Sequence, residues 1–217
     1  MSSLKIFLAA TTFAALTASS GNAAFLDYTQ VGTGKTTLDY DSIANPDKSG
    51  RTSAGVFTMT EVAGGNPASL GLGPSFAAFC LDLITTMSSG KNYKVNNSNP
   101  FNNVGGVDLS VNNRGDNIQS LYDAVYIPSV SGAPAFSLTD NIQSAAFQVA
   151  LWEILYETSA NGFDLEDGNF SIDGSTSVTG TGGVIDTANA YLNFAGLNLS
   201  YAGTKYVGGT RFNLHFL

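Results

Sequence analysis

Two side chains in this sequence could react with each other, those of Cys80 and Gln148. Cys80 is the only cysteine, and a thiol is a strong nucleophile once it is deprotonated. Gln148 lies in the helix-like run Ala145–Tyr156, where it shares one face with apolar residues, Ala145, Leu151, Trp152 and Leu155. A primary amide on a buried face costs about 1–3 kcal/mol unless it is paired. Gln148 is therefore either a satisfied core residue or the reactive group of a site.

A cysteine thiolate held against a glutamine carboxamide can displace ammonia and leave an internal thioester. Cys80 lies in a predicted buried strand over residues 75–83, and a period of two puts Asp82 on the same side of that strand. Asp82 could shuttle a proton, although backbone amides could equally activate the thiol. Trp152, one turn from Gln148, would shield the thioester from water. These four residues form the candidate site.

The sequences around both residues resemble the two motifs of the thioester domains of bacterial surface proteins. Those domains carry an aromatic–Cys–apolar–acidic motif, here Phe79-Cys80-Leu81-Asp82. Far downstream they carry apolar–Gln–x–x–apolar–Trp, here Phe147-Gln148-Val149-Ala150-Leu151-Trp152. The resemblance covers about residues 55–200. The chain is also similar to exported Gram-negative proteins that join this domain to a C-terminal sorting tail, but no sorting tail, wall anchor or stalk follows in this sequence.

The resemblance implies covalent adhesion. An amine on a surface or matrix protein, such as a lysine side chain, or a small amine would attack the Gln148 acyl carbon, and Cys80 would leave as a thiol. Such single-turnover chemistry would make the protein a binder rather than an enzyme. By composition alone Cys80 is an inert core thiol, because free cysteine is among the most buried residue types. A non-covalent structural or binding module of the extracellular matrix is therefore the alternative.

The N-terminus predicts export. Residues 1–23 combine a basic start at Lys5, an apolar segment at Ile6–Ala18 and a small-residue cleavage site at Gly21-Asn22-Ala23. The apolar segment is shorter than the roughly 20 residues that span a bilayer. We expect a mature chain of residues 24–217, a single thioester-type domain that is secreted or at the cell surface, without a transmembrane segment. The net charge of −8, with nine Lys and Arg, argues against binding to nucleic acid or anionic membranes.

The order of predicted elements is strands, a helical middle and strands again, which indicates an α+β fold. We expect a β-sandwich or barrel-like sheet and a helical subdomain at about residues 112–160 that carries Gln148. The predicted strands are Phe25–Val31, Thr36–Tyr40, Gly55–Val62, Ser75–Leu83, Asn169–Ile172, Leu197–Tyr201 and Thr210–Phe216. The predicted helices are Gly115–Tyr126, Ala145–Tyr156, with a cap at Ser137 or Thr139-Asp140, and Val184–Phe194, which should end at Gly196.

Three other patterns are weaker. Gly32–Thr36 resembles part of a phosphate-binding loop, but Thr29 stands where the motif needs glycine. An acidic cluster lacks the spacing of an EF-hand, so we expect solvated turns and neither a metal nor a cofactor; its members are Asp164, Glu166, Asp167, Asn169 and Asp173. Nothing in the sequence places the sole histidine, His215, beside Cys80, so a cysteine hydrolase is not expected.

Overall fold

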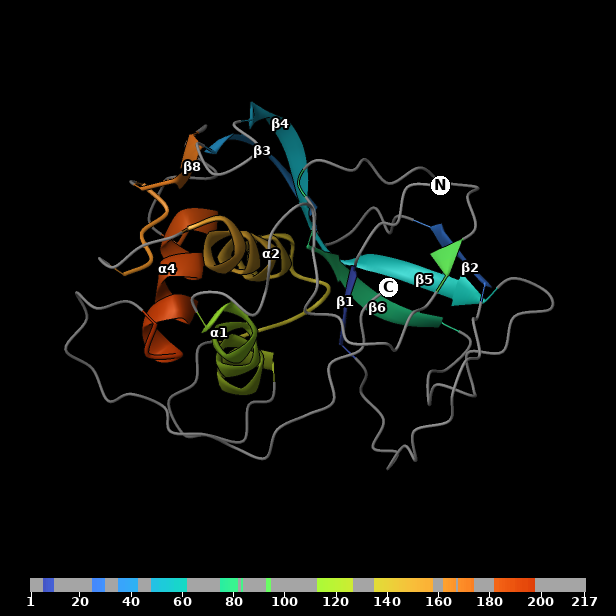
Figure 1. The fold of residues 1–217 in the computed structure, drawn as a ribbon. Coiled ribbons are helices and arrows are strands. Elements are labelled where there is room, and N and C mark those ends of the chain that lie inside the picture. Colours follow the sequence, from blue (N-terminus) through green and yellow to red (C-terminus); the bar gives the residue numbers. More distant parts are fainter. Residues whose placement is uncertain are drawn as a thin grey trace.

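The computed structural model combines helices with antiparallel sheets, in agreement with the predicted α+β class (Figure 1). The residues that the structure describes are 6–9, 25–29, 35–42, 48–61, 75–81, 83, 93–94, 113–126, 135–157, 162–166, 168–173 and 182–197. Asp82, His215 and the predicted strand Thr210–Phe216 lie outside these residues. So do Gly32–Gly34 and all of the predicted strand Leu197–Tyr201 except Leu197.

A five-stranded sheet has the order β1-β6-β5-β2-β7, and its neighbouring strands are antiparallel. Its strands are β1 (Ile6–Ala9), β2 (Phe25–Thr29), β5 (Phe57–Glu61), β6 (Ser75–Cys80) and β7 (Tyr93–Lys94). Strand β6 is central to the site because it ends at Cys80. On one side Ala78 pairs with Phe57, and on the other side Cys80 pairs with Ile6 of β1. Strand β1 belongs to the segment that the sequence predicts as an export signal.

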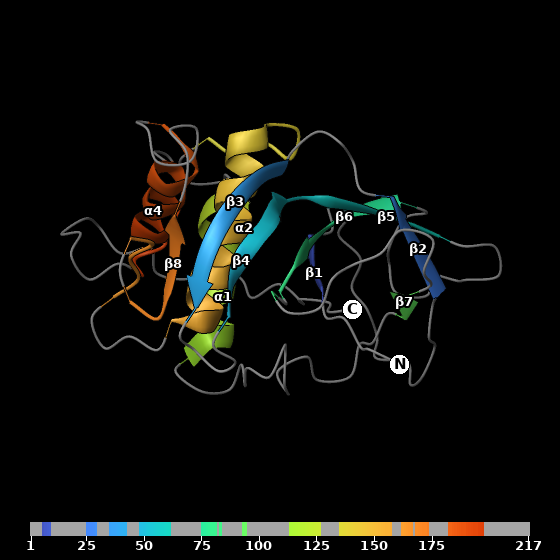
Figure 2. The ribbon, with the colours of Figure 1, turned by 90° about the horizontal axis from the view of Figure 1, so that it is seen from above.

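A three-stranded antiparallel sheet, in the order β4-β3-β8, lies over the longest helix (Figure 2). Its strands are β3 (Lys35–Ser42), β4 (Lys48–Gly55) and β8 (Phe170–Asp173). Only Val56 separates β4 from β5, so this stretch of chain passes from one sheet to the other. Gly55 has a φ of 139°, which glycine adopts without steric strain.

Strands β4 and β5 differ from the sequence-based expectation at two places. The single strand predicted over Gly55–Val62 is divided between two sheets, because the chain turns at Gly55 and Val56. The run Asn45-Pro46-Asp47-Lys48-Ser49-Gly50 is typical of a turn cluster. Residues 48–50 nevertheless begin β4, because eight cross-strand pairs between β3 and β4 override the local turn preference.

The helical part consists of α1 (Arg114–Leu121) with a π-helical continuation, η3 (Tyr122–Tyr126), then α2 (Asn141–Tyr156) and α4 (Val184–Phe194). The predicted cap at Asp140 is confirmed, since its Oδ1 accepts a hydrogen bond of 2.8 Å from the Gln143 N–H. Helix α4 ends as predicted. Gly196 has a φ of 73°, and the N–H groups of Gly196 and Leu197 donate to the carbonyls of Asn193 and Leu192, which is a Schellman ending.

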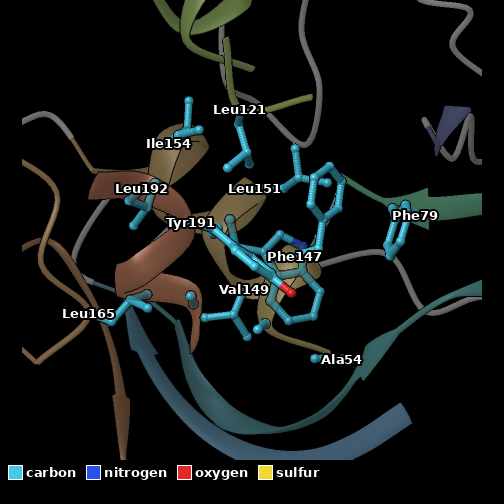
Figure 3. Close-up of a cluster of buried hydrophobic side chains, with 14 of the residues drawn as sticks. Ala54, Phe79, Leu121, Phe147, Val149, Leu151, Ile154, Leu165, Tyr191 and Leu192 are labelled. Carbon is cyan, nitrogen blue, oxygen red and sulfur yellow. The ribbon is translucent and has the colours of Figure 1, made fainter. Parts of the chain in front are cut away.

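Helix α2 is more deeply buried than a single apolar face would require. Every residue from Ser144 to Tyr156 is buried, because α1, α4 and strands β3, β4 and β8 all contact this helix. Figure 3 shows side chains of α2 packed with those of α4 and β4. From Ser144 onward the helix therefore has no solvent face. Its polar residues therefore need partners inside the protein.

Candidate functional site

The buried carboxamide of Gln148 is bound to the main chain of Cys80. Gln148 Oε1 accepts a hydrogen bond of 2.8 Å from the Cys80 N–H, and Gln148 Nε2 donates one of 2.5 Å to the Cys80 carbonyl oxygen. The two residues are 68 positions apart in the sequence. The fold thus brings the Gln148 side chain of α2 to the main chain of Cys80 at the end of β6.

This pairing fixes which way the carboxamide points. A main-chain N–H can only donate and a carbonyl oxygen can only accept, so Oε1 must face the former and Nε2 the latter. Such a pair of bonds to one residue is what a neighbouring strand makes in an antiparallel ladder. The last pair between β5 and β6 joins Phe57 and Ala78. At Cys80 the Gln148 side chain therefore makes the hydrogen bonds that a neighbouring strand would make.

Two more residues of α2 hold the same stretch of main chain. Trp152 Nε1 donates a hydrogen bond of 2.8 Å to the Cys80 carbonyl oxygen, and the Tyr156 hydroxyl accepts one of 3.1 Å from the Leu83 N–H. Gln148, Trp152 and Tyr156 follow each other at intervals of four residues, which places them along one side of the helix. The sequence predicts only shielding for Trp152, but its indole N–H also anchors the end of β6.

The Cys80 side chain is buried, with a relative exposure of 6%. Side chains of a strand stand roughly perpendicular to the sheet, whereas the ladder hydrogen bonds lie within it. The thiol therefore leaves the main chain at a steep angle to the plane in which Gln148 is bound. The predicted proton shuttle, Asp82, lies outside the described residues, so its role stays a prediction.

Aromatic rings surround the residue that precedes Gln148. The Phe147 ring lies 4.9 Å from that of Phe79 and 5.1 Å from that of Phe136, measured between centroids. Phe79 comes from β6 and precedes Cys80 (Figure 3). Tyr126 of η3 stands 6.2 Å from Phe147, and burial raises the pKa of its hydroxyl. These rings form an apolar cluster around Phe147.

Sequence reasoning missed two buried carboxylates, Glu153 in the last turn of α2 and Glu157 directly after the helix. Glu153 Oε1 accepts a hydrogen bond of 2.8 Å from the Asp164 N–H, while its Oε2 is buried without a hydrogen-bond partner. Burial, reinforced by the nearby Glu157, raises the pKa of Glu153 to about 9. Glu157 Oε2 accepts a hydrogen bond of 2.6 Å from the Asn169 N–H. The sequence could have indicated both carboxylates, because they are ionisable residues in or next to an otherwise apolar helix.

These contacts give part of the acidic cluster a different role from the one considered in the sequence. Asp164 and Asn169 offer main-chain N–H groups to Glu153 and Glu157. Among the residues that the structure describes, no three His, Cys, Asp or Glu side chains gather as a metal site would require. Asp167 and the side chain of Asp173 lie outside that part of the chain. In the described ranges, no helix is both long and apolar enough to span a bilayer.

No protein-family model, curated protein or solved structure matches this chain.

Proposed function

We propose that this protein captures amines covalently through an internal thioester between Cys80 and Gln148. The observation that carries the proposal is the pairing of the Gln148 carboxamide with the main chain of the only cysteine, at 2.8 Å and 2.5 Å. A buried amide could have been paired with any polar group of the core. Its partner is the residue that carries the only thiol of the chain.

The same pairing supports the chemistry of thioester formation. A nucleophile attacks a carboxamide from above or below its plane, and the thiol of a strand residue leaves the ladder plane in that direction. As sulfur bonds to the acyl carbon, negative charge develops on Gln148 Oε1. The Cys80 N–H, 2.8 Å from this oxygen, is oriented to stabilise it. The C–N bond then breaks, and the thiol proton leaves with the nitrogen as ammonia, with Asp82 as the proposed shuttle.

Trp152 supports the thioester state in two ways. When ammonia leaves, the Cys80 carbonyl loses the Gln148 Nε2 donor but keeps the Trp152 indole N–H at 2.8 Å. The carbonyl is therefore never left unpaired in a buried site. The ring is itself 2% exposed and keeps water from the acyl carbon.

Capture follows when an amine of a surface or matrix protein, such as a lysine side chain, attacks the thioester carbon. The C–S bond breaks, the thiol of Cys80 takes up the proton that the amine loses, and an amide joins the two proteins. Each molecule reacts once, so the protein acts as an adhesin or matrix cross-linker, secreted or at the cell surface, and not as an enzyme. As part of this proposal we assign the chain to the thioester-domain fold, with a β-sandwich or barrel-like sheet and a helical subdomain.

A second function is favoured by a specific observation. Gln148 is fully paired as an ordinary amide, on both Oε1 and Nε2, which is what a structural core residue requires. In that case the protein is a non-covalent module of the extracellular matrix, and Cys80 is an inert buried thiol.

The intact mass of the purified secreted protein separates the two functions. A thioester lowers the mass by one ammonia, and methylamine then replaces this deficit with a methylamide on Gln148. The Cys80→Ser variant is the matched control, because it keeps the main-chain groups that bind Gln148 while removing the thiol. A wild-type mass that equals the sequence mass and does not respond to methylamine would reject the thioester.

A further inference from the structure

The Gln148–Cys80 pairing has a stereochemical requirement that a cross-linked amide does not meet. Gln148 Oε1 and one N–H of Nε2 both face Cys80, so the bonded hydrogen must lie on the same side of the C–N bond as the oxygen. A primary amide always has such a hydrogen. In a secondary amide of the trans form the substituent takes this position, and the single N–H points the opposite way. The cis form would restore the pairing, but it is strongly disfavoured for amides of this kind.

We propose that this site distinguishes ammonia from substituted amines after the chemical step, and so makes capture of a target one-directional. With ammonia, the product is the original Gln148 carboxamide, which fits against Cys80. With an alkylamine, the substituent points at the Cys80 carbonyl oxygen, and the Gln148 side chain has to leave the pairing. The thiol and the acyl carbon are then no longer held together, so Cys80 does not attack the new amide. This inference rests on the proposed thioester.

The reactions balance without a further reactant. In the resting protein the Cys80 thiol and the Gln148 carboxamide give a thioester and ammonia, with one C–S bond formed and one C–N bond broken. Ammonia reverses this step, because its amide regains both hydrogen bonds to Cys80. An alkylamine gives a secondary amide and the free thiol, and the loss of the pairing blocks the return.

A neighbouring hydrogen bond provides an internal reference for the release of the Gln148 side chain from Cys80. In the alkylamide product the Cys80 carbonyl keeps the Trp152 indole donor, while the Cys80 N–H loses the Gln148 Oε1 acceptor. The Leu83 N–H is bound by the Tyr156 hydroxyl and does not depend on Gln148. Amide hydrogen exchange should therefore accelerate at Cys80 and stay unchanged at Leu83.

Isotope exchange tests the proposal on the purified secreted protein. In ¹⁵N-ammonium, the label should enter the side chain of Gln148, as read from the mass of the peptide that contains it. A ¹⁴N-ammonium arm identifies hydrolysis to glutamate, which also adds one mass unit, and Cys80→Ser should show no label. The methylamide, once formed and freed of methylamine, should return to Gln148 in ammonium at least about ten times more slowly than the label enters a protein whose Gln148 carboxamide has first been restored with ¹⁴N-ammonium.

Each outcome bears on a different statement. A methylamide that reverts as fast as the label enters, or that leaves hydrogen exchange at Cys80 unchanged, would overturn the one-directional capture while leaving the thioester intact. A protein that carries the ammonia deficit but takes up no label would overturn the reversible reaction with ammonia. A protein with no deficit, no label and no methylamide would overturn the proposed thioester and this inference with it.

Discussion

The two parts of helix α2 satisfy their buried polar groups in different ways. Near its middle, Gln148 is neutral, and its Oε1 and Nε2 both bond to Cys80. Five residues later, Glu153 has one oxygen bonded to the Asp164 N–H and the other without a hydrogen-bond partner. Both side chains are fully buried. The difference is that β6 offers a donor and an acceptor side by side, whereas the loop after α2 offers Glu153 a donor only.

This comparison separates a part of the helix that is held by a neutral pairing from a part that is held by a titratable contact. An amide that is bonded through both its oxygen and its nitrogen is held in one orientation, which the proposed thioester chemistry would need. A half-paired carboxyl is stable only while it carries a proton, because an unpaired buried charge is far more costly than an unpaired neutral group. The predictions below test the two parts of α2 separately.

The largest expected effect is the pH dependence caused by Glu153. Its pKa is raised from 4.5 to about 9 in the folded protein. The stabilising contribution of the protonated form is therefore fully present below pH 4.5 and is lost as the pH rises towards 9. The loss can reach about 1.4 kcal/mol per pH unit. Urea unfolding of the wild type should show the free energy of unfolding falling between pH 5 and pH 8.

Glu153→Gln should remove most of this slope, since the amide keeps an acceptor for the Asp164 N–H and does not ionise. Glu166→Gln is the matched control, because Glu166 is exposed and its replacement should leave the slope unchanged. A Glu153→Gln protein that still loses stability over the same pH range would show that another group is responsible.

The next largest effect concerns the paired part of the helix. Gln148→Leu leaves the Cys80 N–H without the Gln148 acceptor and should lower the free energy of unfolding by about 2–4 kcal/mol, from lost pairing in a buried site. Cys80→Ser keeps that pairing and should lower it by less than about 1 kcal/mol. Both variants should lack the ammonia deficit. Equal destabilisation by the two would mean that the main-chain pairing does not support the fold.

Gly168→Ala tests the loop that holds Glu157. Gly168 has a φ of +105°, and an added Cβ would collide with Glu157 Oε2. The expected loss is about 1–3 kcal/mol, from backbone strain and the displaced carboxylate. Gly182→Ala is the matched control, because Gly182 also has a positive φ, +75°, but an added Cβ would meet no atom within 4 Å. The difference between the melting temperatures of the two variants reports the contact with Glu157 together with the difference in strain between φ values of +105° and +75°.

The smallest expected effect is that of Trp152→Phe, which keeps an aromatic ring and removes the indole N–H. Loss of one hydrogen bond to the Cys80 carbonyl should lower stability by about 0.5–1.5 kcal/mol. In the thioester state, where Gln148 Nε2 is gone, the same carbonyl would lose its Trp152 donor. The ammonia deficit should therefore be smaller, or disappear faster in buffer, than in the wild type. An unchanged deficit and lifetime would limit Trp152 to shielding.

Much of the helical part could be predicted from local patterns. The bounds of α4 follow from apolar spacing and the ending at Gly196, and Asp140 has the side chain of a helix cap. The division between β4 and β5 could not be predicted, because residues 55–61 alternate like one strand. Only the positive φ of Gly55 and the separate pairing partners of the two strands divide them.

Cys80 and Gln148 stand out from the sequence alone, because a lone cysteine and a polar residue on an apolar helix are visible in composition and period. The sequence did not determine how Gln148 is bound. The tertiary structure decided that the amide pairs with the main chain of Cys80, that Trp152 donates to the same carbonyl, and that Glu153 meets the loop after α2. These contacts join residues far apart in the chain or depend on how a loop folds back. They arise where α2 meets the end of β6 and the loop that follows α2, which no local pattern encodes.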